Sequence, residues 1–126
     1  MATSGYMSTS NRYIKYTISI SQNSQSISGN TSNVTVSVRF FRTNTGYTSY
    51  GTGTVYCKIN GTTYSAGVTP DQKITNGGIV LFSRTLNISH NADGSKNLTC
   101  SAWISHNVVT SSEQSYSQTL STIPRA

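Results

Sequence analysis

The sequence predicts an all-β fold, an antiparallel β-sandwich of about seven to eight strands with an Ig-like or jelly-roll arrangement. Three observations predict it. No stretch of the 126 residues has sustained helical periodicity. Apolar and polar residues instead alternate in short blocks, which Gly, Asn and Asp separate at the spacing of strands and turns. A chain of this length has room for one core. A closed β-barrel is the alternative.

The first two expected strands have the clearest alternation. Residues 13–21 read YIKYTISIS and residues 33–42 read NVTVSVRFFR. Their β-branched residues favour a pleated surface, and Arg39 and Phe41 fall on the outward face. The inward set comprises Ile14, Tyr16, Ile18, Ile20, Val34, Val36, Val38 and Phe40. The polar stretch QNSQSISGNTS between them, residues 22–32, is expected to be a loop.

A long exposed loop and a hairpin are expected next. The loop is TNTGYTSYGTGT, residues 43–54, which is too poor in aliphatic residues to be core. The hairpin is TVYCKINGTTYSAGV, residues 54–68. Asn60-Gly61 can supply the two positive-φ residues of a type I′ turn. Val55, Cys57 and Ile59 should then face inward.

The rest of the chain reads as three strands and their connections. Residues 69–78 are an expected loop, and residues 79–89, IVLFSRTLNIS, are a strand whose broken alternation suggests a bulge or two covered faces. HNADGSK, residues 90–96, is expected to be a tight hairpin turn. Two further strands follow over 97–105 and 115–123, joined by a loop, and Pro124 ends the pairing.

The domain organisation expected from this pattern has three parts. Residues 1–11 are a flexible N-terminal segment, residues 12–123 are a single β-sandwich domain, and residues 124–126 begin a linker to further domains. No run approaches the roughly 18 apolar residues of a membrane span. We therefore expect no membrane partner.

The charge balance favours anionic partners but not nucleic acid. The formal net charge is +6, and only 10% of residues are charged, against about 25% in typical domains. The nine basic residues are scattered singly, without the run that would follow a phosphate backbone. Polyanions of the cell wall, such as teichoic acids, remain candidate partners.

Candidates for catalysis or metal binding are sparse. Asp71, Asp93 and Glu113 are the three acids, each in an expected loop, whereas acid/base catalysis needs two carboxylates close together. His90 and Asp93 fit a polar β turn better than a catalytic or calcium site, because the DG pair suits backbone geometry. We expect no enzyme activity, no metal and no cofactor.

The two cysteines are far apart in sequence and have no CxxC spacing. Zinc binding is therefore poorly supported. A Cys57–Cys100 disulfide is geometrically allowed, but two buried thiols are the expected state for a protein that matures in a cytoplasm.

Trp103 is the most informative candidate for binding. Leu98, Cys100 and Ala102 mark the core face of its strand, so Trp103 points outward. An outward tryptophan can stack on a sugar ring or grip a protein partner; alternatively, a loop such as residues 46–53 covers it. The same alternation predicts that other aromatic and basic residues also point outward. They form one binding surface if their strands share a sheet. The tentative ligand-binding set is Trp103, Tyr47, Tyr50, Tyr56, Arg39, Phe41 and Lys58.

Several longer motifs resemble a known family. They are SNRYIKYTISISQNSQSISGNTSNVTVSVRF, YCKINGTTYSAG, SHNADGSKNLTCSAW and QTLSTIPRA. Together they are similar to modules of minor tail proteins of siphophages that infect Gram-positive bacteria, over residues 12–126. The resemblance implies a domain of the tail tip, baseplate or tail fibre, assembled in the host cytoplasm and present in several copies in the virion. TIPRA would mark a module boundary. No catalytic residues carry over.

The expected function is a non-enzymatic virion module, either structural or binding to the host cell wall. Its partners would be other tail proteins, a homo-oligomer such as a trimer, and cell-wall glycans or teichoic acids. In the binding version, Trp103 and the tyrosines stack on sugars, while Arg39 and Lys58 attract phosphate-bearing polymers. The alternative is a carbohydrate-binding module appended to a phage lysin or another cell-wall enzyme.

Overall fold

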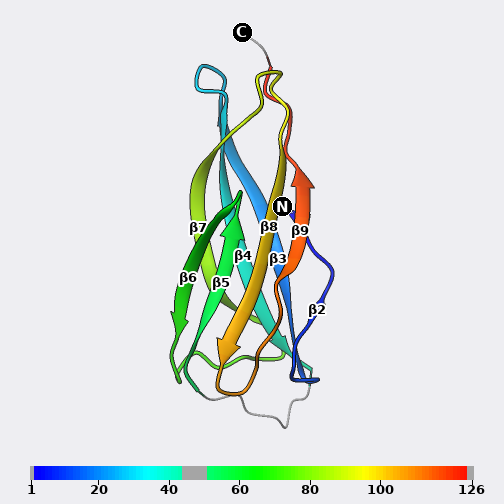
Figure 1. Cartoon of the computed structure of the whole chain (residues 1–126), viewed down its shortest axis with the longest axis vertical. Helices are drawn as coiled ribbons and strands as arrows, with labels where there is room; N and C mark the ends of the chain where they lie inside the picture. The colour runs from blue at the N-terminus through cyan, green and yellow to red at the C-terminus, as the bar shows by residue number, and fades with distance from the viewer. Residues whose placement is uncertain (1, 44–50, 125–126) are drawn as a thin grey trace.

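Two antiparallel β-sheets pack face to face in an elongated sandwich (Figure 1). The structure is a computed structural model that describes residues 2–43 and 51–124. The described residues form nine strands and no helix, so none of them forms a helix able to span a membrane. The strands are β1 (Ala2–Thr3), β2 (Met7–Ser8), β3 (Ile14–Ser26), β4 (Thr31–Arg42), β5 (Gly53–Ile59), β6 (Thr62–Val68), β7 (Ile79–Ser89), β8 (Asn97–His106) and β9 (Gln114–Thr119).

The strand order identifies the kind of sandwich. One sheet, sheet A, has the order β1-β3-β4-β7, with β2 also paired to β3; the other, sheet B, has the order β6-β5-β8-β9. Of the seven long strands, the first, second and fifth (β3, β4 and β7) lie in sheet A. The third, sixth and seventh (β5, β8 and β9) lie in sheet B. This is the Ig-type arrangement, except that the fourth strand pairs with the third. The predicted all-β sandwich is confirmed.

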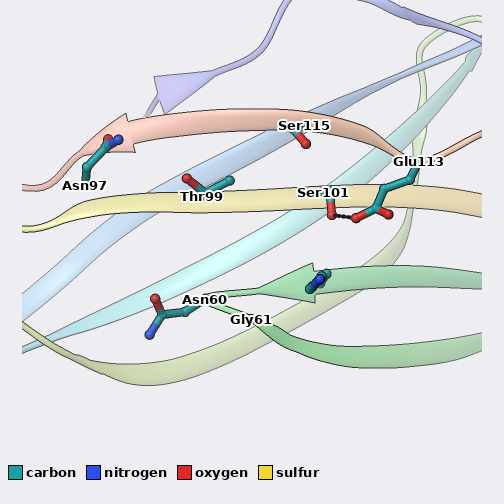
Figure 2. A pocket seen from close by; sticks show the side chains of 8 residues that line it. Asn60, Gly61, Asn97, Thr99, Ser101, Glu113 and Ser115 are labelled. Carbon is teal, nitrogen blue, oxygen red and sulfur yellow. Dashed lines mark hydrogen bonds between the residues drawn. The ribbon is translucent and has the colours of Figure 1, made fainter.

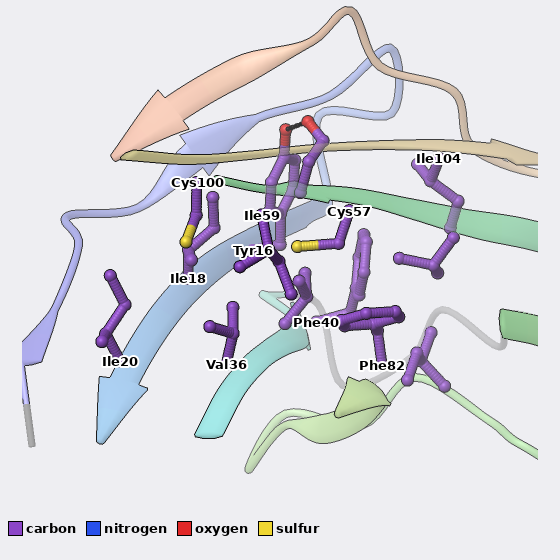
Figure 3. Close-up of a cluster of buried hydrophobic side chains, with 14 of the residues drawn as sticks. Tyr16, Ile18, Ile20, Val36, Phe40, Cys57, Ile59, Phe82, Cys100 and Ile104 are labelled. Atoms are coloured by element: carbon purple, nitrogen blue, oxygen red, sulfur yellow. Dashed lines mark hydrogen bonds between the residues drawn. The ribbon is translucent and has the colours of Figure 1, made fainter. Parts of the chain in front are cut away.

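The core lies between the two inner faces (Figure 3). Every inward residue predicted in the first two strands is buried, and so are Val55, Cys57, Ile59 and the core face of β8. Tyr16 is fully buried, and its hydroxyl donates to the Ala102 carbonyl at 2.9 Å. Gln114 Nε2 donates to the same hydroxyl at 3.0 Å. The polar tip of this core tyrosine is therefore satisfied across the two sheets.

Sheet A extends further than the sequence predicts. Residues 22–32 were expected to be a loop, but β3 runs to Ser26 and β4 starts at Thr31. Polar side chains bond between β3 and β4 here: Asn23 Nδ2 donates to Asn33 Oδ1 at 3.0 Å, and Gln25 Nε2 donates to Ser32 Oγ at 3.3 Å. Hydrogen bonds between polar side chains can thus stabilise a strand pair whose composition is typical of a loop. The result is a ribbon that projects beyond the core at the top of Figure 1.

Two irregular features in the second half of the chain also follow from pairing. The broken alternation of β7 is a bulge: Val38 pairs with Phe82 and Arg39 with Val80, which leaves Leu81 as the extra residue. Leu81 and Phe82 are consequently both buried. The predicted type I′ turn is confirmed, because Asn60 and Gly61 have φ of 51° and 89°.

HNADGSK is a turn, but the hairpin prediction is wrong. It joins β7 of sheet A to β8 of sheet B, so it is a corner between sheets. The Asp93 carboxylate accepts from the Ser95 backbone N–H at 3.0 Å, which forms an Asx-turn. Gly94 has a φ of 87°, and a Cβ there would collide with the carbonyl of Ile123. Glycine is therefore required both for the turn and for the close approach of the C-terminal segment.

Both terminal segments lie against the sandwich. Residues 2–11, which the sequence predicts to be flexible, include β1 and β2, both paired with β3. At the other end, β9 stops at Thr119, earlier than expected, yet Leu120 and Ile123 are buried. The Ile123 N–H donates to the Gly94 carbonyl at 2.9 Å. The division at residues 12 and 124 stays a prediction.

Candidate ligand-binding faces

The outer face of sheet B carries Trp103 and Tyr56 as a stacked pair. They are direct cross-strand partners on β8 and β5. Their ring centroids are 5.3 Å apart and the ring planes differ by 12°. Both side chains are partly exposed, while the flanking Val55 and Cys57 are fully buried. The outward direction predicted for these two aromatics is therefore confirmed, and register alone places them together.

A polar hollow of about 290 Å³ lies on the same sheet (Figure 2). Lys58 follows Tyr56 by two positions on β5 and pairs with Ser101, which precedes Trp103 by two on β8. Successive outward residues of a strand are neighbours on one face, so the hollow and the stacked pair are contiguous. The hollow is lined by Lys58, Asn60, Gly61, Asn97, Thr99, Ser101, Glu113 and Ser115.

Glu113 gives this hollow a carboxylate that the sequence did not predict as a site residue. It lies just before β9, and the buried Ser101 hydroxyl donates to its Oε2 (Figure 2). Glu113 therefore sits in the same hollow as the ammonium of Lys58. Such a surface offers hydroxyls, amides and both signs of charge to a polar ligand. Its sequence signal was weak, because Glu113 lies in a loop and joins Ser101 only through the pairing of β8 with β9.

Arg39 and Phe41 do not share that face. They lie on β4, in sheet A, whereas Tyr56, Lys58 and Trp103 lie in sheet B. The two sheets turn their outer faces in opposite directions, so the single aromatic and basic platform that would form if these strands shared a sheet does not exist. The predicted outward direction of both side chains is confirmed, since their neighbours Val38 and Phe40 are fully buried.

A second and larger hollow, of about 440 Å³, surrounds Arg39 and Phe41 on sheet A. The N-terminal segment forms one wall of it through Tyr6, whose ring meets Phe41 edge to face at 5.4 Å. The Lys15 ammonium lies 3.7 Å from the centroid of the Tyr6 ring. Tyr6 and Val80 are exposed and were missed by sequence reasoning, because Tyr6 precedes the expected domain. This region, the sheet A hollow, includes Tyr6, Thr17, Ser19, Ser37, Arg39, Phe41 and Val80.

Tyr47 and Tyr50 lie outside the described residues, as does most of the loop expected to cover Trp103. Their assignment to a ligand site, like that of the other five residues, stays a prediction.

Of the residues considered for catalysis, His90 and Asp71 form hydrogen bonds within the fold. His90 is buried, and its Nδ1–H donates to the Gly94 carbonyl at 2.8 Å, which leaves Nε2 to accept from the Ser32 hydroxyl at 2.7 Å. Hydrogen bonding from Thr69 lowers the pKa of Asp71. Burial lowers the pKa of His106, and the backbone of Gly51 partly opposes this. Among the described residues, no three His, Cys, Asp or Glu side chains gather into a metal-binding group.

The cysteines are free, buried thiols on neighbouring strands of sheet B (Figure 3). Ile59 pairs with Cys100 and Cys57 with Ala102, so the two side chains face the core two residues out of register. Burial raises the pKa of each thiol to about 12, and the proximity of Cys100 adds to the effect at Cys57. Protonated thiols of this kind are poor nucleophiles and poor metal ligands.

Comparison with known proteins places the chain in a group. Residues 1–126 match the model of a family described as "Siphovirus protein of unknown function (DUF859)". The chain belongs to this siphovirus family. No curated protein and no solved structure matches it. Family membership points to a phage structural protein with a virion-level location, which confirms the siphophage part of the sequence resemblance. The tail subfamily and the TIPRA boundary stay predictions.

Proposed function

We propose that this domain is a non-enzymatic module of the phage tail that binds host cell-wall glycan on the outer face of sheet B. The observation that carries the proposal is the stacked pair of Tyr56 and Trp103 beside the polar hollow. Membership of a siphovirus family supports a virion component. The resemblance of the motifs to minor tail proteins supports the tail as its location.

The geometry of the stacked pair suits a sugar ring. The two rings are held nearly parallel, so each stiffens the other, and both remain partly exposed. A flat, rigid aromatic surface binds the apolar face of a sugar with little loss of side-chain entropy. The two rings form an offset stack, so each ring keeps one face that its partner does not cover.

The polar hollow supplies the second half of glycan recognition. A sugar seated on the stacked pair projects its hydroxyl and amide groups toward Lys58, Ser101 and Glu113, which lie one step along the same face. Carboxylates and ammonium groups form strong hydrogen bonds with hydroxyls. Because the hollow is shallow, each contact is weak, and a virion would gain affinity from many copies.

The test is binding of the domain, presented as a multivalent bead or nanoparticle, to purified host cell walls stripped of phosphate polymers. Trp103→Ala is expected to weaken binding per domain at least about tenfold, a loss of roughly 1.4 kcal/mol. Trp103 is the only tryptophan, so soluble wall fragments should also change its fluorescence directly. Tyr6→Ala is the matched control, because it removes an exposed tyrosine from the opposite sheet.

Three results would contradict the proposal. One is wild-type protein that fails to bind even when multivalent; another is equal loss of binding in Trp103→Ala and Tyr6→Ala. The third is an oligomer in solution whose Trp103 is inaccessible to a fluorescence quencher, which would assign this face to assembly. Urea unfolding of each variant separates lost binding from lost folding.

A further inference from the structure

The sheet A hollow is a separate cationic site on the opposite side of the sandwich. Its basic group is Arg39, an exposed residue of β4 that makes no hydrogen bond or ion pair with any other described residue. A cross-strand neighbour on the same face, Lys15, adds a second positive charge at the rim. Arginine without an acidic partner is the arrangement expected where an anion binds.

The hollow holds no negative charge to oppose an anion. The three acids of the chain all lie elsewhere: Asp71 in the connection from β6 to β7, Asp93 in the corner from β7 to β8, and Glu113 in the polar hollow of sheet B. With nine basic residues in the chain, the surrounding field is also positive. The hollow is therefore complementary in charge to an anionic ligand.

The stem of the Arg39 side chain lies close to the loop before β7. The loop before β7 passes so close that a Cβ on Gly78 would lie 2.9 Å from Arg39 Cδ and 2.6 Å from a ring carbon of Phe41. Gly78, with φ of 91°, thus allows the loop to support the stem of the arginine. A side chain whose stem has less room to move loses less entropy when it binds.

The aromatic rings in this hollow already contact other side chains of the protein. Lys15 covers a face of Tyr6, and Tyr6 meets Phe41 edge to face. A nucleobase or a sugar stacks on a ring face, and the Lys15 ammonium occupies one face of Tyr6. A flexible chain of carbon and hydroxyl groups needs only apolar contact and hydroxyl partners. The edges of Tyr6 and Phe41, exposed Val80, and the hydroxyls of Thr17 and Ser37 provide both.

We propose that the sheet A hollow binds an anionic polymer of phosphodiester-linked polyols, with Arg39 on a phosphate and the hydroxyl-lined floor on the polyol. This adds a ligand class and a second face to the proposed function, and it does not depend on the stacked pair. A domain with both sites would contact the glycan and its attached phosphate polymer from opposite sides.

The experiment is calorimetric titration of the whole chain with a synthetic poly(glycerol phosphate) oligomer. Arg39→Gln is expected to weaken binding about tenfold, as for the loss of one charge-assisted contact. Arg84→Gln is the matched control: it removes the same charge from an exposed residue of β7 whose guanidinium lies 4.3 Å from the Tyr64 ring centroid, outside the hollow. It should change affinity less than about twofold, since only screened long-range attraction is lost.

The competing ligands give the other outcomes. Phosphatidylglycerol vesicles and single-stranded DNA should bind more weakly than the polyol phosphate polymer; tighter binding of either would overturn the proposal. Equal loss in Arg39→Gln and Arg84→Gln would also overturn it, because net charge alone would then explain the attraction. Trp103→Ala should bind the polymer like wild type. If Trp103→Ala binds the polymer but no longer binds stripped walls, the two sites are independent. If Arg39→Gln binds the polymer like wild type, this proposal fails and the proposed glycan site is unaffected.

Discussion

The two outer faces of this sandwich use the same ingredients to different effect. Each carries two aromatic rings and a basic residue beside a row of hydroxyls. On sheet B, cross-strand register sets Tyr56 and Trp103 nearly parallel. On sheet A, Tyr6 arrives from the N-terminal segment and meets Phe41 at 88°. The first arrangement leaves flat surface for a ring, and the second leaves a walled hollow around a free guanidinium.

This difference shows that residue content does not define a site. A tyrosine on the neighbouring strand can stack parallel to its cross-strand partner, because both side chains stand perpendicular to one sheet. A tyrosine that comes from a segment laid along the sheet edge turns its face toward Lys15 instead. Where the second ring comes from therefore decides which ligand the face suits.

The largest expected effect is a loss of stability at high pH, and it comes mainly from the two buried thiols of sheet B. Cys57 and Cys100 both belong to sheet B, and each has a folded pKa of about 12 against an ordinary value of 9.0. The folded state thus keeps protons that the unfolded state loses. Stability is therefore fully present below about pH 9 and declines as the pH rises from about 9 toward 12. Burial raises the pKa of Tyr16 as well, which adds to the fall.

Urea unfolding at pH 8, 9, 10 and 11 measures this decline. A Cys57→Ala, Cys100→Ala double variant should have a shallower pH dependence, although it starts from lower stability because of the cavities. At pH 8 the folded wild type should react with a thiol reagent only as fast as it opens. Rapid reaction of both thiols in the folded protein would show that the inner face of sheet B is wet.

A middle-sized effect is expected on sheet A alone. Gly78→Ala forces a Cβ against the Phe41 ring at a backbone φ of 91°. It should cost about 1 to 3 kcal/mol of unfolding free energy and weaken binding at the sheet A hollow. The emission of Trp103, on the other sheet, should not change.

Gly77→Ala is the control for that variant. A Cβ on Gly77 meets no heavy atom within 4 Å, and the residue has no positive φ. Its stability should stay within about 0.5 kcal/mol of wild type. Equal destabilisation by the two substitutions would mean that the loop, and not its contact with Phe41 and Arg39, is what matters.

The smallest effect concerns the stacked pair itself. A double-mutant cycle of Tyr56→Leu and Trp103→Leu, measured by urea unfolding, should give a coupling energy of about 0.5 to 1.5 kcal/mol. The cross-strand hydroxyls of Thr99 and Ser117, 2.9 Å apart on the same face, provide a reference pair. Their coupling should be smaller because both are exposed. No coupling between the rings would remove the claim that the platform is rigid.

The sequence by itself determined the local features. Alternation with period two fixed which side chains of β3, β4, β5 and β8 face the core, including the outward direction of Trp103, because parity within a strand needs no knowledge of its partner. Asn60 and Gly61 fixed a hairpin, since few other residues adopt positive φ. The turn at Asp93-Gly94 was readable for the same reason, because Gly94 has a φ of 87°.

Only the tertiary structure decided which faces those outward residues share. Backbone hydrogen bonds are alike for every strand, so the sequence of β4 does not state that it pairs with β7, nor that of β5 that it pairs with β8. The separation of Arg39 from Trp103 follows from those pairings. The contact of Tyr6 with Phe41 follows from the pairing of β1 and β2 with β3, and that of Glu113 with Ser101 from the pairing of β8 with β9. The face toward which a side chain points depends on its own strand. Which side chains lie beside it depends on contacts between residues far apart in the chain.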